Sequence, residues 1–77
     1  MIIRSQNKEV VINFENLISV RIGGYSGDSI VVFTECEALE IGKYSTTEKA
    51  IKVLDMILTN YERRWEVFEM PQDEHID

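Results

Sequence analysis

The chain has 77 residues, of which 44% are hydrophobic and 29% are charged, and its net charge is −6. This length allows one domain with a small core, and the regular apolar content excludes a wholly disordered chain. No apolar run reaches the roughly 20 residues needed to cross a bilayer, and the polar run that follows Ile3 is unlike a signal peptide. We therefore expect a cytoplasmic protein that does not contact membranes.

The first 44 residues have the pattern of antiparallel strands joined by short turns. Ile18, Val20 and Ile22 alternate with polar residues, as in a half-buried strand, and we expect all three to face a helix. Residues 23–29 contain three glycines but lack the Lys-Ser/Thr of a phosphate-binding loop, so we expect a hairpin loop with Tyr25 at its tip. The predicted strands cover residues 2–5, 9–14, 18–22, 30–34 and 39–44.

Residues 46–63 have the periodicity of an amphipathic helix. Ser45 and Glu48 have the spacing of a capping box, which places the start of the helix. One arc of about 160° on the helical wheel carries the apolar side chains, and we expect the sheet to bury it. Its members are Ala50, Ile51, Val53, Leu54, Ile57, Leu58, Tyr61 and Trp65.

These elements predict an α+β fold: an antiparallel β-meander of 4–6 strands with one C-terminal amphipathic helix packed across it. Residues 67–70 return to strand character after the helix. We expect residues 1–71 to form a single domain. Residues 72–77 are acidic, and we expect them to be a disordered tail.

The negative charge is concentrated at the C-terminal end. Residues 1–65 carry nine acidic and eight basic side chains, whereas residues 66–77 carry five acids and no Lys or Arg. Without a basic stripe, direct binding to DNA or RNA is not expected. Cys36 is the only cysteine and His75 the only histidine, so we expect no disulfide within the chain, no metal site and no cofactor.

Three stretches spread over the chain resemble short proteins encoded by phages and prophages of Firmicutes: MIIRSQ at residues 1–6, GKYSTTEKA at 42–50 and FEMPQDE at 68–74. The resemblance is to an uncharacterised family and carries no catalytic motif. It implies an accessory protein in the cytoplasm of a bacterial host. The strand meander closed by one helix also resembles pleckstrin-homology-like domains, although it has fewer strands.

Two hypotheses for function follow. The first is a non-enzymatic interaction module that binds and inhibits a host factor, which would suit an anti-defence role. The alternative is a sponge that sequesters a nucleotide-like signal at an oligomer interface, with cations for phosphate and aromatic rings for the base. An enzyme is not expected, because His75 lies in the predicted tail. The candidate ligand- or partner-binding residues are Arg4, Arg21, Tyr25, Lys43, Tyr44, Arg63 and Trp65.

The pattern of the fourth predicted strand favours a homodimer or a higher homo-oligomer. Val31 and Phe33 alternate with Val32, so apolar side chains point to both faces of the sheet, whereas one helix covers only one face. A second copy of the chain would cover the other face. Alternatively, the strand at residues 67–70 folds back and covers it within one chain.

Overall fold

The computed structural model describes residues 1–76, which form six strands, one α-helix and two short 3₁₀ helices. This confirms the predicted α+β class with a single helix packed on the strands. In chain order the elements are β1 (Ile2–Arg4), β2 (Val11–Asn13), η1 (Phe14–Asn16), β3 (Ser19–Gly23), β4 (Ser29–Phe33), β5 (Ala38–Lys43), α1 (Thr47–Glu62), β6 (Val67–Glu69) and η2 (Asp73–His75).

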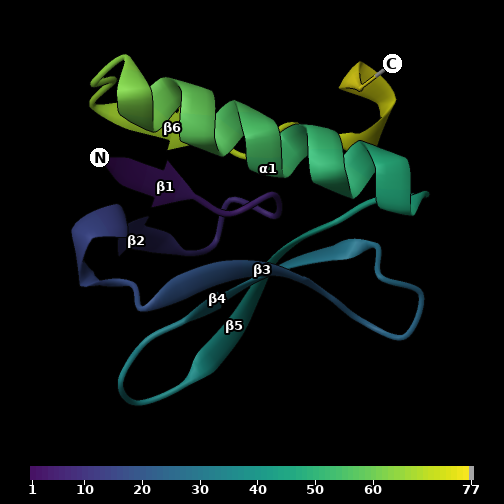
Figure 1. The fold of residues 1–77 in the computed structure, drawn as a ribbon, viewed down its shortest axis with the longest axis horizontal. Coiled ribbons are helices and arrows are strands. Elements are labelled where there is room, and N and C mark those ends of the chain that lie inside the picture. The colour runs from purple at the N-terminus through teal and green to yellow at the C-terminus, as the bar shows by residue number, and fades with distance from the viewer. Residues whose placement is uncertain (77) are drawn as a thin grey trace.

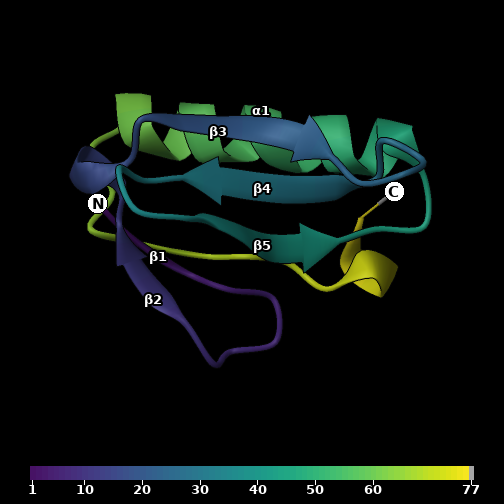
Figure 2. The same cartoon turned by 90° about the horizontal axis from the view of Figure 1, so that it is seen from below.

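The strands are divided between two three-stranded sheets, with the orders β2-β1-β6 and β3-β4-β5. All pairs are antiparallel except β1 and β6, which are parallel and place Ile3 opposite Phe68. The structure therefore differs from one continuous meander, because β1 recruits a strand that follows the helix. Figures 1 and 2 show α1 packed on the sheet along β3 and β4, with the smaller sheet on the β5 side.

The core lies between the β3-β4-β5 sheet on one side and α1 with the smaller sheet on the other. Ile30 and Val32 of β4 are fully buried, whereas Val31 and Phe33 on the opposite face are half-buried. On that outer face the Arg21 guanidinium lies 5.0 Å from the centre of the Phe33 ring. The remaining core side chains are Ile3, Ile41, Tyr44, Ala50, Val53, Ile57, Phe68, Met70 and Ile76.

The loop between β3 and β4 is the predicted hairpin connection. Gly24 and Gly27 adopt positive φ angles of 86° and 67°, which glycine allows without the steric cost that a side chain brings. Tyr25 between them is fully exposed. Helix α1 begins one residue later than the capping box predicted, because the side chain of Thr46, not Ser45, accepts the hydrogen bond from the Lys49 amide.

The apolar arc of α1 is buried along a narrower stripe than predicted. Ala50, Val53 and Ile57 are buried, because three short strands are too narrow to cover the full arc. Ile18, predicted to face the helix, is 66% exposed, and only Val20 and Ile22 of that group pack against the core. The exposed members of the arc are Ile51 (46%), Leu58 (56%), Tyr61 (44%) and Trp65 (57%).

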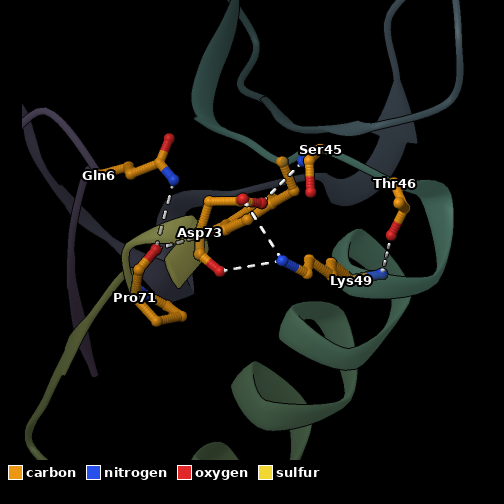
Figure 3. Close-up of polar contacts among 7 residues, drawn as sticks. Gln6, Ser45, Thr46, Lys49, Pro71 and Asp73 are labelled. Carbon is orange, nitrogen blue, oxygen red and sulfur yellow. Dashed lines mark hydrogen bonds and ion pairs between the residues drawn. The ribbon is translucent and has the colours of Figure 1, made fainter. Parts of the chain in front are cut away.

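Residues 72–76 pack against the body of the protein, so the prediction of a disordered tail is wrong for them. Asp73 accepts a hydrogen bond of 2.7 Å from the Ser45 amide and lies 3.4 Å from the Lys49 ammonium, as Figure 3 shows. Ile76 is only 8% exposed and joins the core. Asp73 thus meets the amino-terminal end of α1, where negative charge is favourable. Asp77 lies outside the described residues.

Candidate functional site

The exposed part of the helical arc borders an apolar groove between β3 and α1. Phe14 of η1 and Val20 of β3 form one wall, and side chains of α1 form the other. The groove encloses about 320 Å³, within the range of about 300–1,000 Å³ that is common for ligand sites. The helical side chains that line it are Leu54, Asp55, Ile57 and Leu58. We call this feature the β3–α1 groove.

A second hollow, of about 560 Å³, lies at the carboxyl end of α1, and we call it the helix-end pocket. Two rings meet at its border with the groove, because Phe14 packs against Tyr61 with ring centres 4.8 Å apart. The two hollows therefore lie on either side of one aromatic pair. The pocket is lined by Met1, Glu15, Tyr61, Glu62, Arg64, Trp65 and Glu66.

The backbone at the end of α1 positions the pocket residues. The amide of Trp65 donates to the carbonyl of Asn60, and the amide of Arg64 donates to the carbonyl of Tyr61, both at 3.1 Å. These two bonds are the Schellman arrangement that closes a helix, in which the residue after the cap takes a positive φ. Arg64 occupies that position with a φ of 59°, where glycine is usual. The turn places Trp65 beside Tyr61 in the lining of the pocket.

Carboxylates dominate the charge around the two hollows. Glu15 pairs with the N-terminal ammonium at 3.0 Å, and the hydrogen bond from that ammonium lowers the pKa of Glu15 below its usual value. Against the four lining carboxylates stand one guanidinium and the N-terminal ammonium, which gives a local charge of −2. The carboxylates belong to Glu15, Asp55, Glu62 and Glu66.

The structure distributes the seven candidate residues over several parts of the fold and does not bring them together in one site. Arg4 lies 3.4 Å from Glu69 in the smaller sheet, and Arg21 lies on the outer face of the larger one. Tyr25 stands alone at the tip of the β3–β4 loop, and Lys43 is exposed at the end of β5. Arg63 is the capping residue of α1 and does not line the helix-end pocket, whereas Trp65 does.

Tyr44 is a core residue, so we leave it out of the site. Its ring is 2% exposed, and its hydroxyl donates to the carbonyl of Pro71 at 2.9 Å. Burial raises the pKa of Tyr44 to about 12, and the nearby Asp73 carboxylate adds to the shift. Tyr44 therefore helps to hold the C-terminal segment, together with Gln6, whose side-chain amide lies 3.4 Å from the same carbonyl (Figure 3).

The predicted candidates do not include the groove residues, because the periodicity of the helix predicts that these side chains are buried in the core. Leu54, Leu58 and Tyr61 belong to the predicted arc, and nothing in the periodicity separates its covered part from its open part. One feature of the sequence could have indicated an open part, namely the width of the apolar arc: an arc of about 160° is broader than the face that a small sheet can cover.

Among residues 1–76, no three His, Cys, Asp or Glu side chains are grouped so that they could hold a metal ion. Within the same residues, no helix has the length and apolar character that crossing a membrane requires. Cys36 is an exposed thiol. No protein-family model, curated protein or solved structure matches the chain, so the groove and the pocket carry the functional argument by themselves.

Proposed function

We propose that this protein is a non-enzymatic interaction module that binds another protein through the β3–α1 groove. The observation that carries the proposal is the open half of the helical arc. Four large apolar or aromatic side chains of this arc are 44–57% exposed. Of these, Leu58 lines the mostly apolar β3–α1 groove, and Tyr61 and Trp65 line the helix-end pocket beside it. A contiguous apolar surface of this kind on a small protein is typical of a binding site for another macromolecule.

In the phage setting that the sequence resemblance implies, the partner would be a host protein whose activity is blocked when its own binding segment is occupied. A surface of this kind needs no reactive group. Its specificity would come from shape, from the aromatic pair at the border of the two hollows, and from the surrounding carboxylates.

The alternative, a sponge for a nucleotide-like signal, has less support. The proposed arginines lie on different parts of the surface. Beside Tyr61 and Trp65, the helix-end pocket offers Arg64 and the N-terminal ammonium, which is already paired with Glu15. Three carboxylates line the same pocket and would repel a phosphate. Absorbance of the purified protein at 260 nm tests this alternative, because a tight sponge retains its ligand through purification.

Affinity capture from bacterial lysate with three matched baits tests the proposed function. Leu58→Glu places a charge in the groove at a side chain that is 56% exposed, so the fold should tolerate it. Val11→Glu is the control, because Val11 is 61% exposed on β2 and lies outside both hollows. We expect a protein that is retained by the wild type and by Val11→Glu and is lost with Leu58→Glu. Capture that is equal for all three baits would reject the groove as the binding surface.

A further inference from the structure

The outer edge of β3 is open along its whole length. In the described chain, Ser19–Gly23 pair with β4 on one side, and their backbone makes no hydrogen bond on the other side. The opposite edge of the same sheet is partly covered, because the Gln6 amide donates to the Ile41 carbonyl and the Lys43 amide donates to the Gln6 side chain. In the smaller sheet the edge strands β2 and β6 are only three residues long.

An open strand edge binds a further strand readily, because alternate residues direct their N–H and C=O groups away from the existing partner. The five residues of β3 span about 17 Å, which is enough to pair with a segment of five or six residues. The β3–α1 groove lies at this edge, with Val20 on one side and Leu54 and Leu58 on the other. Every second side chain of an added strand would therefore enter an apolar groove.

The relative direction of α1 and β3 determines which end of an added strand lies near the helix-end pocket. Thr47 at the start of α1 donates to the Ser26 carbonyl just beyond the end of β3, whereas Phe14, just before β3, packs on Tyr61 near the end of α1. Helix and strand thus run in opposite directions, as Figure 2 also shows. The helix-end pocket adjoins the Ser19 end of β3, so a strand antiparallel to β3 would reach it with its C-terminal part.

The chemistry of the pocket selects the side chain that enters it. Glu62 and Glu66 offer negative charge, and the exposed rings of Tyr61 and Trp65 offer faces on which a cation is favourable. The carboxyl end of the helix adds to the negative potential, and the three lining carboxylates outnumber the Arg64 guanidinium and the N-terminal ammonium, which also line the pocket. A lysine or arginine side chain satisfies all three features.

We infer that the β3–α1 groove takes an extended segment of a partner protein, which adds to β3 as an antiparallel strand and places a Lys or Arg near its C-terminal end in the helix-end pocket. This inference rests on the proposed function and names the binding mode and the partner chemistry. Antiparallel addition is chosen because antiparallel pairs are the commoner and slightly more stable arrangement. Backbone hydrogen bonds supply affinity, and the alternate side chains supply specificity.

A second copy of this chain fits the groove less well than a basic segment does. Each chain carries a net charge of −6, so pairing β3 with β3 around a twofold axis would bring two chains of like charge together. Charge complementarity therefore favours a basic partner over a copy of the chain itself.

Selection of random linear decapeptides displayed on phage, with the full-length protein as bait and Leu58→Glu as the parallel bait, supplies the probe. We expect enriched peptides with alternating apolar residues and a Lys or Arg near the C-terminal end. Three versions of the consensus peptide are then synthesised. Two carry N-methyl groups on alternate backbone amides, one on the odd-numbered set and one on the even-numbered set. The third has norleucine in place of the basic residue. Calorimetry compares the dissociation constants.

N-methylation of the set that faces β3 should weaken binding at least about tenfold, and methylation of the other set should have little effect. Loss of the basic side chain should weaken binding roughly two- to fivefold. Two variants of the protein should change the affinity for the basic peptide by similar factors in opposite directions: Glu66→Gln should weaken binding, and Arg64→Ala should strengthen it. A pocket with a merely structural role would not produce these opposite changes.

Each contrary outcome is distinct. Peptides that bind through Leu58 but tolerate N-methylation of either set would overturn strand addition and leave the proposed function standing. If replacing the basic residue leaves the affinity of the peptide unchanged, the helix-end pocket is not the site that binds a Lys or Arg side chain. Absence of any peptide that depends on Leu58 would overturn both proposals. A mass of two chains that falls to one in Leu58→Glu would show that a second copy, not a basic partner, fills the groove.

Discussion

Replacing Arg64 with glycine should stabilise the protein. Arg64 adopts a φ of 59° at the end of α1, a conformation that costs a residue with a side chain roughly 1–2 kcal/mol. Glycine removes that cost, although its greater freedom in the unfolded chain returns part of the gain. The net expectation is about 0.5–1 kcal/mol, which for a domain of 60–100 residues raises the melting temperature by roughly 2–8 °C.

Arg64→Ala is the matched control, because it removes the guanidinium and keeps the positive φ. Thermal unfolding followed by circular dichroism at pH 7 should give the order Arg64→Gly above wild type, with Arg64→Ala close to wild type. If Arg64→Gly were no more stable than Arg64→Ala, the helix would not close through the bonds from Arg64 and Trp65 to the carbonyls of Tyr61 and Asn60, and the geometry of the helix-end pocket would be wrong.

Three further predictions follow from burial and charge. Ile57→Ala should lower the free energy of unfolding by roughly 2–5 kcal/mol and Leu58→Ala by less than about 1 kcal/mol, because Ile57 is 2% exposed and Leu58 is 56% exposed. Equal losses of stability in urea unfolding would contradict the position of the groove. The hydrogen bond from the Ser45 amide and the nearby Lys49 lower the pKa of Asp73. The Asp73 carboxylate therefore contributes stability above its ordinary pKa, and this contribution is lost as the pH falls below about 4. Asp73→Asn should be less stable than wild type at pH 7, and the difference should disappear in acid. Light scattering on dilute protein should give a mass about twice the 9.0 kDa of one chain, because Val31 and Phe33 leave an apolar outer face that a second copy would cover. Phe33→Glu should shift the measured mass toward that of the monomer. A mass of one chain at micromolar concentration would reject this dimer.

Sequence periodicity predicted the elements well because each of them depends on local signals. The helix at residues 46–63 corresponds to α1 at Thr47–Glu62, and each predicted strand overlaps an observed one. The division into two sheets had no such signal, because β1 pairs with β6 across the whole length of the chain. The start of the helix shifted by one residue for a similar reason, since the Ser45 amide is bonded to the distant Asp73.

The candidate site was predictable only in part. Trp65 was named as a ring that could stack on a nucleotide base, and it does line the helix-end pocket. Leu54 and Leu58 were not identified as surface residues, because burial along α1 is decided by the width of the β3-β4-β5 sheet, which is a property of the assembled fold. The tail was misjudged because Ile76 was overlooked as an apolar anchor among acidic neighbours.

Site-specific photocrosslinking in living cells tests the central claim, that the β3–α1 groove is the surface that binds a partner. A photoreactive phenylalanine derivative is placed at Leu58, within the groove, or at Val11, an equally exposed position on β2 outside it. The protein is expressed in a Gram-positive bacterial host and irradiated. The account predicts a discrete protein adduct from position 58 and none from position 11. Identical adduct patterns from the two positions, or none from position 58, would contradict it.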